Sequence, residues 1–316
     1  MEIGSGPGID EPQGPPAANF EVGAGELVSR TISVYIRRIG AYIILVGLPS
    51  FVLGVAGLAL FLALFGVDGY TLYPGVTGAD PISLLLSYLG FLGPTGLAIA
   101  YIFMIGIINT IVLAIVNGAG VKYALDNYGN PDAGEIGESL SHALGRAPTL
   151  IIAQLILSLV MFAIISPVIV LLFGSTVEFD PLNPYPFLSY FAALLPILLV
   201  CLVLIFFISI RLSVTTGVVI AEDLSAIDSI KRSWKLTGGN FWHVLGAGML
   251  LSIVIVLIGA VFVVFSMGLV FVPSEGSTIV TSLISMLFIG ALSSVFQAVL
   301  YKDLASRIGR QDQEWW

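Results

Sequence analysis

The chain has 316 residues, of which 57% are hydrophobic and only 10% are charged, and its mean hydropathy is +1.03. Because a soluble domain is usually about one quarter charged, too few polar residues are present to cover a water-facing surface of this size. The formal net charge of −8 and the lack of a basic stripe argue against nucleic acid as a partner. These properties predict an all-α, polytopic membrane protein.

The two ends of the chain differ from its centre. Residues 1–25 are rich in Gly and Pro and contain no Lys, no Arg and no apolar run, which predicts a disordered tail instead of a signal peptide. We expect residues 26–305 to form one six-helix transmembrane domain and residues 306–316 to form a cytoplasmic tail. Cys201 is the only cysteine, which excludes an intrachain disulfide.

Six apolar blocks are long enough to cross a bilayer, which takes about 20 mostly apolar residues in a helix. A shorter apolar block, residues 82–93, predicts a re-entrant or interfacial segment. The fourth long block stays apolar as far as Ala221, which predicts a helix that projects beyond the bilayer. The six long blocks are residues 40–65, 96–120, 149–173, 187–212, 241–265 and 279–300.

Apart from Arg211 at the end of the fourth block, the Lys and Arg residues are confined to the two ends of the chain and to alternate connections between the blocks. The other three connections carry acidic residues without any base. Because basic connections stay in the cytoplasm, we expect both termini on that side of the plasma membrane. The basic residues are Arg30, Arg37 and Arg38 before the first block, Lys122 and Arg146 after the second, Lys231, Arg232 and Lys235 after the fourth, and Lys302, Arg307 and Arg310 at the end.

Residues 26–40, 133–148 and 225–240 share one plan, a short amphipathic stretch followed by a break and then an apolar block. This plan predicts short interfacial helices at the cytoplasmic face. It indicates either three parallel copies of a unit made of an interfacial helix and two spans, or no repeat at all. In the second case the segments look alike because any cytoplasmic connection between helices tends to be amphipathic and to begin with a polar cap. Two stretches place apolar residues on one helical face: Ile136, Leu140 and Leu144, and Ile227, Ile230 and Trp234. The even-numbered blocks end alike, at Asp126, Asp223 and Asp303.

Candidate contact residues lie at the predicted cytoplasmic face. We expect Arg211 to snorkel to the headgroups, to pair with Asp126, Glu138 or Glu222, or to bind a lipid phosphate. Residues 231–235 combine three cations with an indole, which predicts interface anchoring or contact with anionic headgroups. The candidates for lipid or partner contact are Arg211, Lys231, Arg232, Trp234, Lys235, Asn240 and Trp242. The candidates for structural ion pairs are Asp126, Glu222, Asp223 and Asp303.

Polar residues within the apolar blocks are few, and none is charged near the bilayer centre. Their side-chain amides are expected to bond between helices or to line a pathway. The sequence contains no nucleotide-binding loop, no nucleophile elbow and no zinc-ligand spacing, so we expect no cofactor and no metal. The amides are Asn109, Asn117, Gln154 and Gln297.

Residues 220–242 form the most distinctive run of the chain. Their core reads Ala-Ile-Asp-Ser-Ile-Lys-Arg-Ser-Trp-Lys-Leu-Thr and is followed by Gly-Asn-Phe-Trp. This run resembles the membrane domain of some glycerophosphoryl diester phosphodiesterases and related stand-alone prokaryotic proteins, whose last span ends like Tyr301, Asp303 and Leu304. Gly238 departs from the pattern, because relatives often carry Lys or Arg there. The resemblance implies a six-span layout without the phosphodiesterase activity, which belongs to a separate soluble barrel.

Three functions are compatible with these patterns. The first is a non-catalytic membrane protein that binds or organises lipid, a partner protein or further copies of itself. The second is a carrier of a small solute or a lipid, for which Pro167 and Pro196 would break helices within the membrane. The third is an enzyme that acts on lipid headgroups, with a site built from Arg211, His243, Asp126, Glu222 and Asp223.

Overall fold

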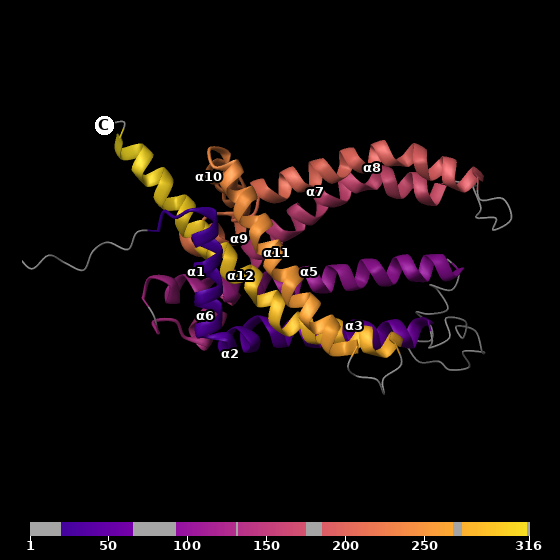
Figure 1. Ribbon diagram of the computed structural model, residues 1–316, viewed down its shortest axis with the longest axis horizontal. Coiled ribbons are helices and arrows are strands. Elements are labelled where there is room, and N and C mark those ends of the chain that lie inside the picture. The colour runs from indigo at the N-terminus through magenta and orange to yellow at the C-terminus, as the bar shows by residue number, and fades with distance from the viewer. Residues whose placement is uncertain (1–19, 66–92, 131, 175–184, 268–273, 315–316) are drawn as a thin grey trace, which may run out of the picture.

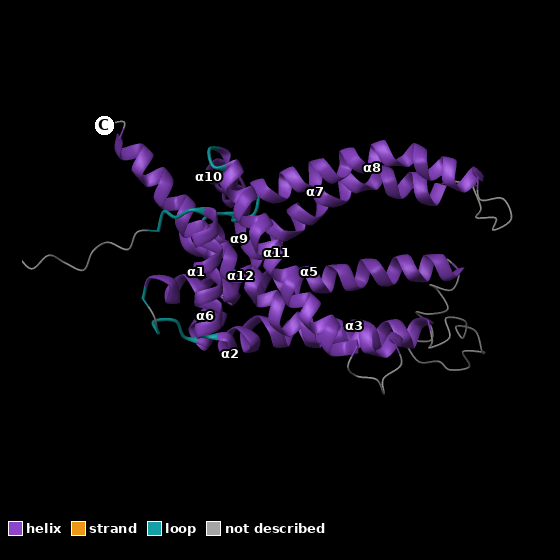
Figure 2. Cartoon of the chain, viewed as in Figure 1, coloured by secondary structure: helices purple, strands orange, loops and turns teal. Residues whose placement is uncertain are grey.

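The computed structural model describes residues 20–65, 93–130, 132–174, 185–267 and 274–314. The regular elements in these ranges are helices, as Figures 1 and 2 show. Within the same ranges, six stretches are long and apolar enough to cross a membrane. This confirms the all-α, multi-pass architecture. The candidate spans are Ile39–Phe61, Phe103–Gly129, Ala147–Leu171, Ser189–Glu222, Phe241–Phe262 and Leu283–Ile308.

The elements fall into long spanning helices and shorter helices that connect or precede them. The long helices are α3 (Leu48–Phe65), α5 (Gly93–Gly129), α7 (Ala147–Gly174), α8 (Tyr185–Arg211), α11 (Phe241–Met267) and α12 (Ser274–Glu314). The shorter ones are α1 (Ala24–Arg37), α2 (Ile39–Tyr42), the π-helix η1 (Ile43–Gly47), α6 (Ile136–Gly145), α9 (Thr215–Glu222) and α10 (Ala226–Gly238).

The folded part of the chain is longer at both ends than expected. Because α1 begins at Ala24 and Val22 is buried, residues 20–25 belong to the domain and not to a tail. At the other end, α12 continues as one helix through most of residues 306–316. The rest of the predicted tail, residues 1–19, and the short apolar block apart from Gly93 lie outside the described residues.

A short helix followed by two spans occurs three times along the chain, starting at α1, α6 and α10. Each short helix packs chiefly on the spans of the preceding unit: α6 on α5, and α10 on α7, α8 and α9. The first short helix, α1, packs on α11 and α12 of the last unit. The contacts therefore close a ring of three units, as three parallel copies would produce.

The short helix α10 turns its small polar residues and Leu236 inward, and it turns two large apolar residues outward. Ser229 and Ser233 are buried, whereas Ile227 and Trp234 are 57% and 43% exposed. In α6, Leu144 is likewise exposed. The apolar faces expected from the sequence are therefore the outer faces, which suits helices that lie at a membrane interface.

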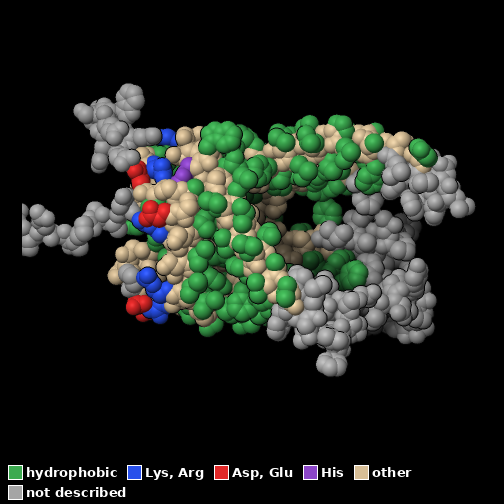
Figure 3. All heavy atoms as spheres, viewed as in Figure 1, with side chains coloured by type: hydrophobic (Ala, Val, Ile, Leu, Met, Phe, Trp, Pro, Cys, Tyr) green, Lys and Arg blue, Asp and Glu red, His purple; other side chains and the backbone are tan. Residues whose placement is uncertain are grey.

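The core lies where the second spans of the three units meet. Helices α5, α9 and α12 pack against one another, and Ala119, Val219 and Leu300 are among their fully buried residues. By contrast, α7 and α8 run side by side at the periphery (Figure 1), and only 6% of the span in α7 is buried against 44% in α12. The charged side chains of the described residues gather at one end of the molecule (Figure 3), which we call the charged end.

The apolar stretch that was expected to continue as one helix to Ala221 is broken after Arg211. Helix α8 ends at Arg211, and the buried helix α9 follows and packs on α5 and α12. The carbonyl of Arg211, which has no partner within α8, accepts hydrogen bonds from the hydroxyls of Ser233 at 3.1 Å and Thr237 at 3.0 Å. These bonds to α10 stabilise the break and fix the position of Arg211.

The first apolar block is also interrupted, by the π-helix η1. Pro49 follows this element and has no N–H to donate to the carbonyl four residues earlier, so a locally wider turn relieves the mismatch. Gly47 lies at the end of η1 against the backbone of Leu287 in α12, where a Cβ atom would meet the Leu287 carbonyl carbon at 3.0 Å and its oxygen at a shorter distance. A glycine is therefore required at this helix crossing.

Candidate functional site

The guanidinium of Arg211 lies among three aromatic rings at the charged end. Its carbon is 5.1 Å from the ring centre of Trp234 in α10, 5.3 Å from Phe207 in α8 and 5.8 Å from Phe241 in α11. All three distances fall within the range of cation–π attraction, about 6 Å. We call these four residues the Arg211 cage.

The Arg211 guanidinium has no carboxylate partner among the described residues. Its Nε is buried and has no hydrogen-bond partner there. Two of the expected acids are engaged elsewhere: Asp126 bonds Lys122 at 2.6 Å, and Glu222 bonds Arg232 at 3.0 Å. Because a guanidinium carries five N–H donors, the cage presents donors that an acceptor from outside these residues would satisfy.

Gly238 makes room for this arrangement. A Cβ atom at Gly238 would lie 3.0 Å from Nη1 of Arg211, so a larger side chain would force the guanidinium to move. This is the position at which the sequence departs from the family pattern that residues 220–242 resemble.

The predicted cluster of Lys231, Arg232 and Lys235 does not act as one basic patch. Arg232 is paired with Glu222, and Lys231 lies 3.6 Å from Asp228. The Ser225 hydroxyl donates to Asp228 at 2.7 Å and, together with Lys231, lowers the pKa of that carboxyl, which therefore stays ionised at neutral pH. Lys235 is exposed and forms no ion pair within the described part of the chain.

The other two candidates at the turn after α10 differ in role. Asn240 joins two helices through its backbone, since its N–H donates to Thr237 at 3.2 Å and its carbonyl accepts from Val244 at 3.0 Å. Trp242 is 79% exposed and stacks edge-on against Phe241, with 5.5 Å between ring centres. Trp242 therefore has the position of an interface anchor, whereas Asn240 is structural.

An apolar groove of about 610 Å³ begins beside the cage and runs between α8 and α11. On α8 it includes Phe206 and Ile210, which are next in sequence to two cage residues. On α11 it extends from Val244 to Leu257, which is about 20 Å along a helix. The remaining lining residues are Ser209, Ser213, Leu245, Gly248, Met249, Ser252, Ile253, Val256 and Phe296.

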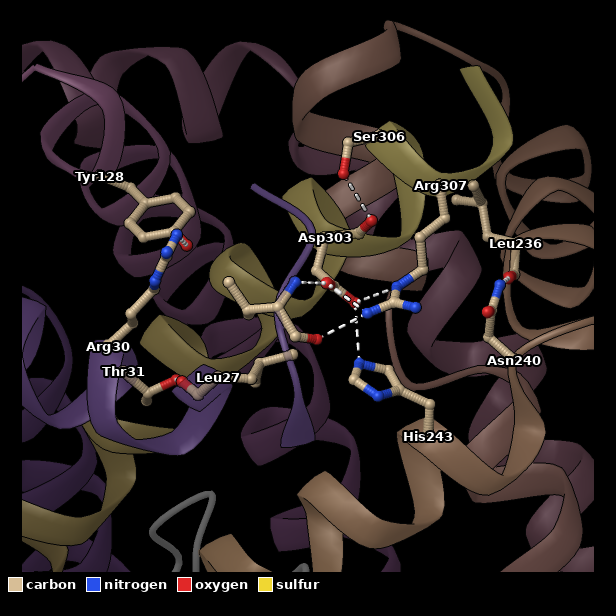
Figure 4. Close-up of polar contacts among 11 residues, drawn as sticks. Leu27, Arg30, Thr31, Tyr128, Leu236, Asn240, His243, Asp303, Ser306 and Arg307 are labelled. Carbon is tan, nitrogen blue, oxygen red and sulfur yellow. Dashed lines mark hydrogen bonds and ion pairs between the residues drawn. The ribbon is translucent and has the colours of Figure 1, made fainter. Parts of the chain in front are cut away.

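A second polar centre at the charged end is built around Asp303, which is fully buried. Its carboxylate accepts hydrogen bonds from Nε of Arg307 at 3.0 Å and from the backbone N–H of Val22 at 2.9 Å, and it contacts Nε2 of His243 at 2.9 Å (Figure 4). Arg307 also donates to the Val22 carbonyl at 2.6 Å. These bonds fix the segment before α1 to α11 and α12, so the centre is structural.

The remaining acidic candidates lie in separate contacts. Asp223, at the left-handed end of α9, pairs with Arg146, and Glu222 also accepts from the Tyr301 hydroxyl at 3.0 Å. Among the described residues no group of three or more His, Cys, Asp or Glu side chains is placed to hold a metal ion. The acids and the histidine of the enzyme hypothesis thus lie in separate ion pairs, apart from Arg211 in its cage.

The two prolines expected to break helices do not do so. Helices α7 and α8 continue through Pro167 and Pro196, and both prolines line one apolar pocket of about 500 Å³ between these helices. Their missing N–H groups are tolerated because each helix loses a single backbone bond. The prolines therefore provide no gate of the kind that the carrier hypothesis invoked.

Comparisons with protein-family models, with curated proteins and with solved structures found no match. The family resemblance of residues 220–242 stays a prediction.

Two members of the cage, Phe207 and Phe241, were not predicted from the sequence. Phe207 had a detectable signal, since it lies four residues before Arg211 and so on the same helical face. Phe241 had no such signal in the sequence, because its contact with Arg211 depends on how α11 crosses α8.

Proposed function

We propose that this integral membrane protein binds one anionic phospholipid at its charged end without catalysing a reaction. The Arg211 cage carries the proposal: a guanidinium held by three rings, with donors that the described residues leave unsatisfied. A phosphate group can accept two parallel hydrogen bonds from a guanidinium. The distribution of Lys and Arg favours a cytoplasmic location for this end.

The groove between α8 and α11 supports a lipid as the source of the phosphate. Its apolar lining begins beside the cage and continues toward the bilayer centre, so a phosphate at Arg211 would direct an acyl chain into it. Burial of such a chain contributes about 0.8 kcal/mol for each CH₂ group. A free phosphate ion would make no use of this surface.

The neighbouring side chains favour a single headgroup over a diffuse basic surface. Lys231 and Arg232 are neutralised by Asp228 and Glu222, which leaves Lys235 to add attraction from the rim, about 1 kcal/mol. Trp242, exposed beside the cage, would hold this edge at the headgroup level.

Arg211→Ala is expected to reduce the binding of an anionic lipid about tenfold, which corresponds to about 1.4 kcal/mol. Native mass spectrometry would compare wild type and variant after release from nanodiscs that contain equal amounts of phosphatidylglycerol and phosphatidylcholine. Wild type should retain one phosphatidylglycerol per chain, and the variant should lose this preference while its melting temperature changes little.

Two further variants make the result specific. Lys231→Ala removes an exposed cation already neutralised by Asp228 and should leave phosphatidylglycerol retention unchanged. Gly248→Trp should fill the groove and weaken retention of both lipids, since a Cβ at Gly248 meets no atom within 4 Å. Equal phosphatidylglycerol retention by wild type and Arg211→Ala would refute the proposal.

A further inference from the structure

Two cavities between the helices carry polar side chains in their lining and have Asn117 of α5 in common. The larger, of about 560 Å³, is lined by residues of α3, α5 and α12. The smaller, of about 260 Å³, is lined by residues of α5, α7, α9 and α12, and by the end of α8. Ligand pockets usually measure about 300–1,000 Å³, so together the cavities have the capacity of a binding site.

The four amide side chains that the sequence places within apolar blocks all line these cavities. Asn109 lines the larger one, Gln154 and Gln297 line the smaller one, and Asn117 lines both. The Ser294 hydroxyl donates to Oδ1 of Asn117 at 3.2 Å. The other three amides form no hydrogen bond with any described residue, so they do not serve as the interhelical bonds that are usual for such residues.

An unpartnered amide inside a membrane is costly. Transfer of an amide from water to a medium without hydrogen bonds costs roughly 4–8 kcal/mol, and the hydrocarbon core supplies no partner. These three groups are therefore expected to be satisfied by molecules within the two neighbouring cavities. Gly54, Gly57 and Gly290, which line the larger cavity, keep that space free of side chains.

The chemistry of the lining selects the class of molecule. Neither cavity is lined by an Asp, Glu, Lys, Arg or His residue among the described residues, so a charged group would enter without compensation. We infer that the two cavities form a second site, which binds an uncharged ligand through its hydroxyl or amide groups. This site is separate from the Arg211 cage, which selects a negative charge.

The ligand can come from two sources, a neutral lipid such as a diacylglycerol or a small neutral solute from water. The full-length protein in phosphatidylcholine liposomes distinguishes them. In one assay a photoreactive, alkyne-tagged diacylglycerol is cross-linked and the adducts are mapped to peptides. In the other, stopped-flow light scattering follows the entry of glycerol or urea. We expect one of the two assays to give a signal above its background. The background for solute entry is measured with empty liposomes, and the background for cross-linking is measured with unirradiated samples.

The decisive comparison uses Asn117→Leu, which removes the amide shared by both cavities, and Thr110→Val, a polar change on α5 that lines neither cavity. The signal should fall at least fivefold in Asn117→Leu and persist in Thr110→Val. Because its amide has no partner to lose, Gln154→Leu should keep or raise the melting temperature. Absence of both signals, equal signals in wild type and Asn117→Leu, or marked destabilisation by Gln154→Leu would overturn the inference.

Discussion

Replacement of Asp303 by Asn is expected to destabilise the protein by about 3–5 kcal/mol, the usual cost of removing one partner from a buried ion pair. The carboxylate accepts bonds from Arg307 and from the Val22 N–H, and it contacts His243. An Asn side chain would turn its NH₂ group toward at least one of these donors, and Arg307 would be left without a counter-charge. Thermal unfolding in detergent measures the loss.

The control is Asp126→Asn, which removes an acid paired within one helix. Among the described residues Asp126 bonds Lys122 alone, and its side chain is 25% exposed, so its loss should cost less than that of the fully buried Asp303. A second measurement is limited proteolysis: without Asp303 the segment around Val22 should be released and cleaved faster. Equal melting temperatures for the two variants would show that the Asp303 centre does not hold the N-terminal segment.

Gly47→Leu is expected to prevent close packing of the first and last spans. The backbone of Leu287 already occupies the space that a Cβ would need, and overpacking usually costs about 1–3 kcal/mol, or more when backbone must shift. Less protein should fold and the melting temperature should fall, which fluorescence-detected chromatography after heating would record.

Gly106→Leu provides the matched comparison, because a Cβ at Gly106 of α5 meets no atom within 4 Å. This variant gains helix propensity and apolar surface in a lipid-facing position, so it should fold at least as well as wild type. If Gly47→Leu behaved like Gly106→Leu, the close crossing of η1 and α12 would be wrong.

Much of the fold could be predicted because hydropathy and basic residues report directly on a bilayer. The apolar blocks gave the six spans, and the regular spacing of short amphipathic stretches gave α6 and α10. Helix lengths could not be predicted in this way. Helices α5 and α12 continue past their first charged residues because pairs such as Lys122 with Asp126 and Asp303 with Arg307 lie four residues apart and support the helix.

Features that depend on contacts between distant segments were not predictable from the sequence. The break after Arg211 requires hydroxyls from α10 to cap its carbonyl, and an apolar run gives no sign of it. The close approach of Gly47 to Leu287 likewise depends on how η1 crosses α12. The composition of residues 231–235 predicted one basic surface, but Lys231 and Arg232 are paired with acids in the structure. The cation in the cage is Arg211.

The two proposed sites lie at different depths in the membrane and bind chemically different groups. The Arg211 cage lies at the charged end, where headgroup phosphates are found, and its guanidinium selects a negative charge. The two cavities lie within the spans and are lined by uncharged side chains that include amides and hydroxyls. A charged ligand would be costly there. Ser209 and Ser213 line both the smaller cavity and the lipid groove, so a bound lipid and an uncharged ligand would share a wall.

The central claim, a specific lipid site at the Arg211 cage, is tested most directly by cross-linking. A phosphatidylglycerol with a photoreactive group near its phosphate would be incorporated into membranes that contain the full-length protein, and adducts would be mapped by peptide sequencing. We expect adducts concentrated at the end of α8 and the start of α11, competed by excess phosphatidylglycerol and lost in Arg211→Ala. Adducts spread evenly around the charged end, and unchanged in Arg211→Ala, would contradict the account.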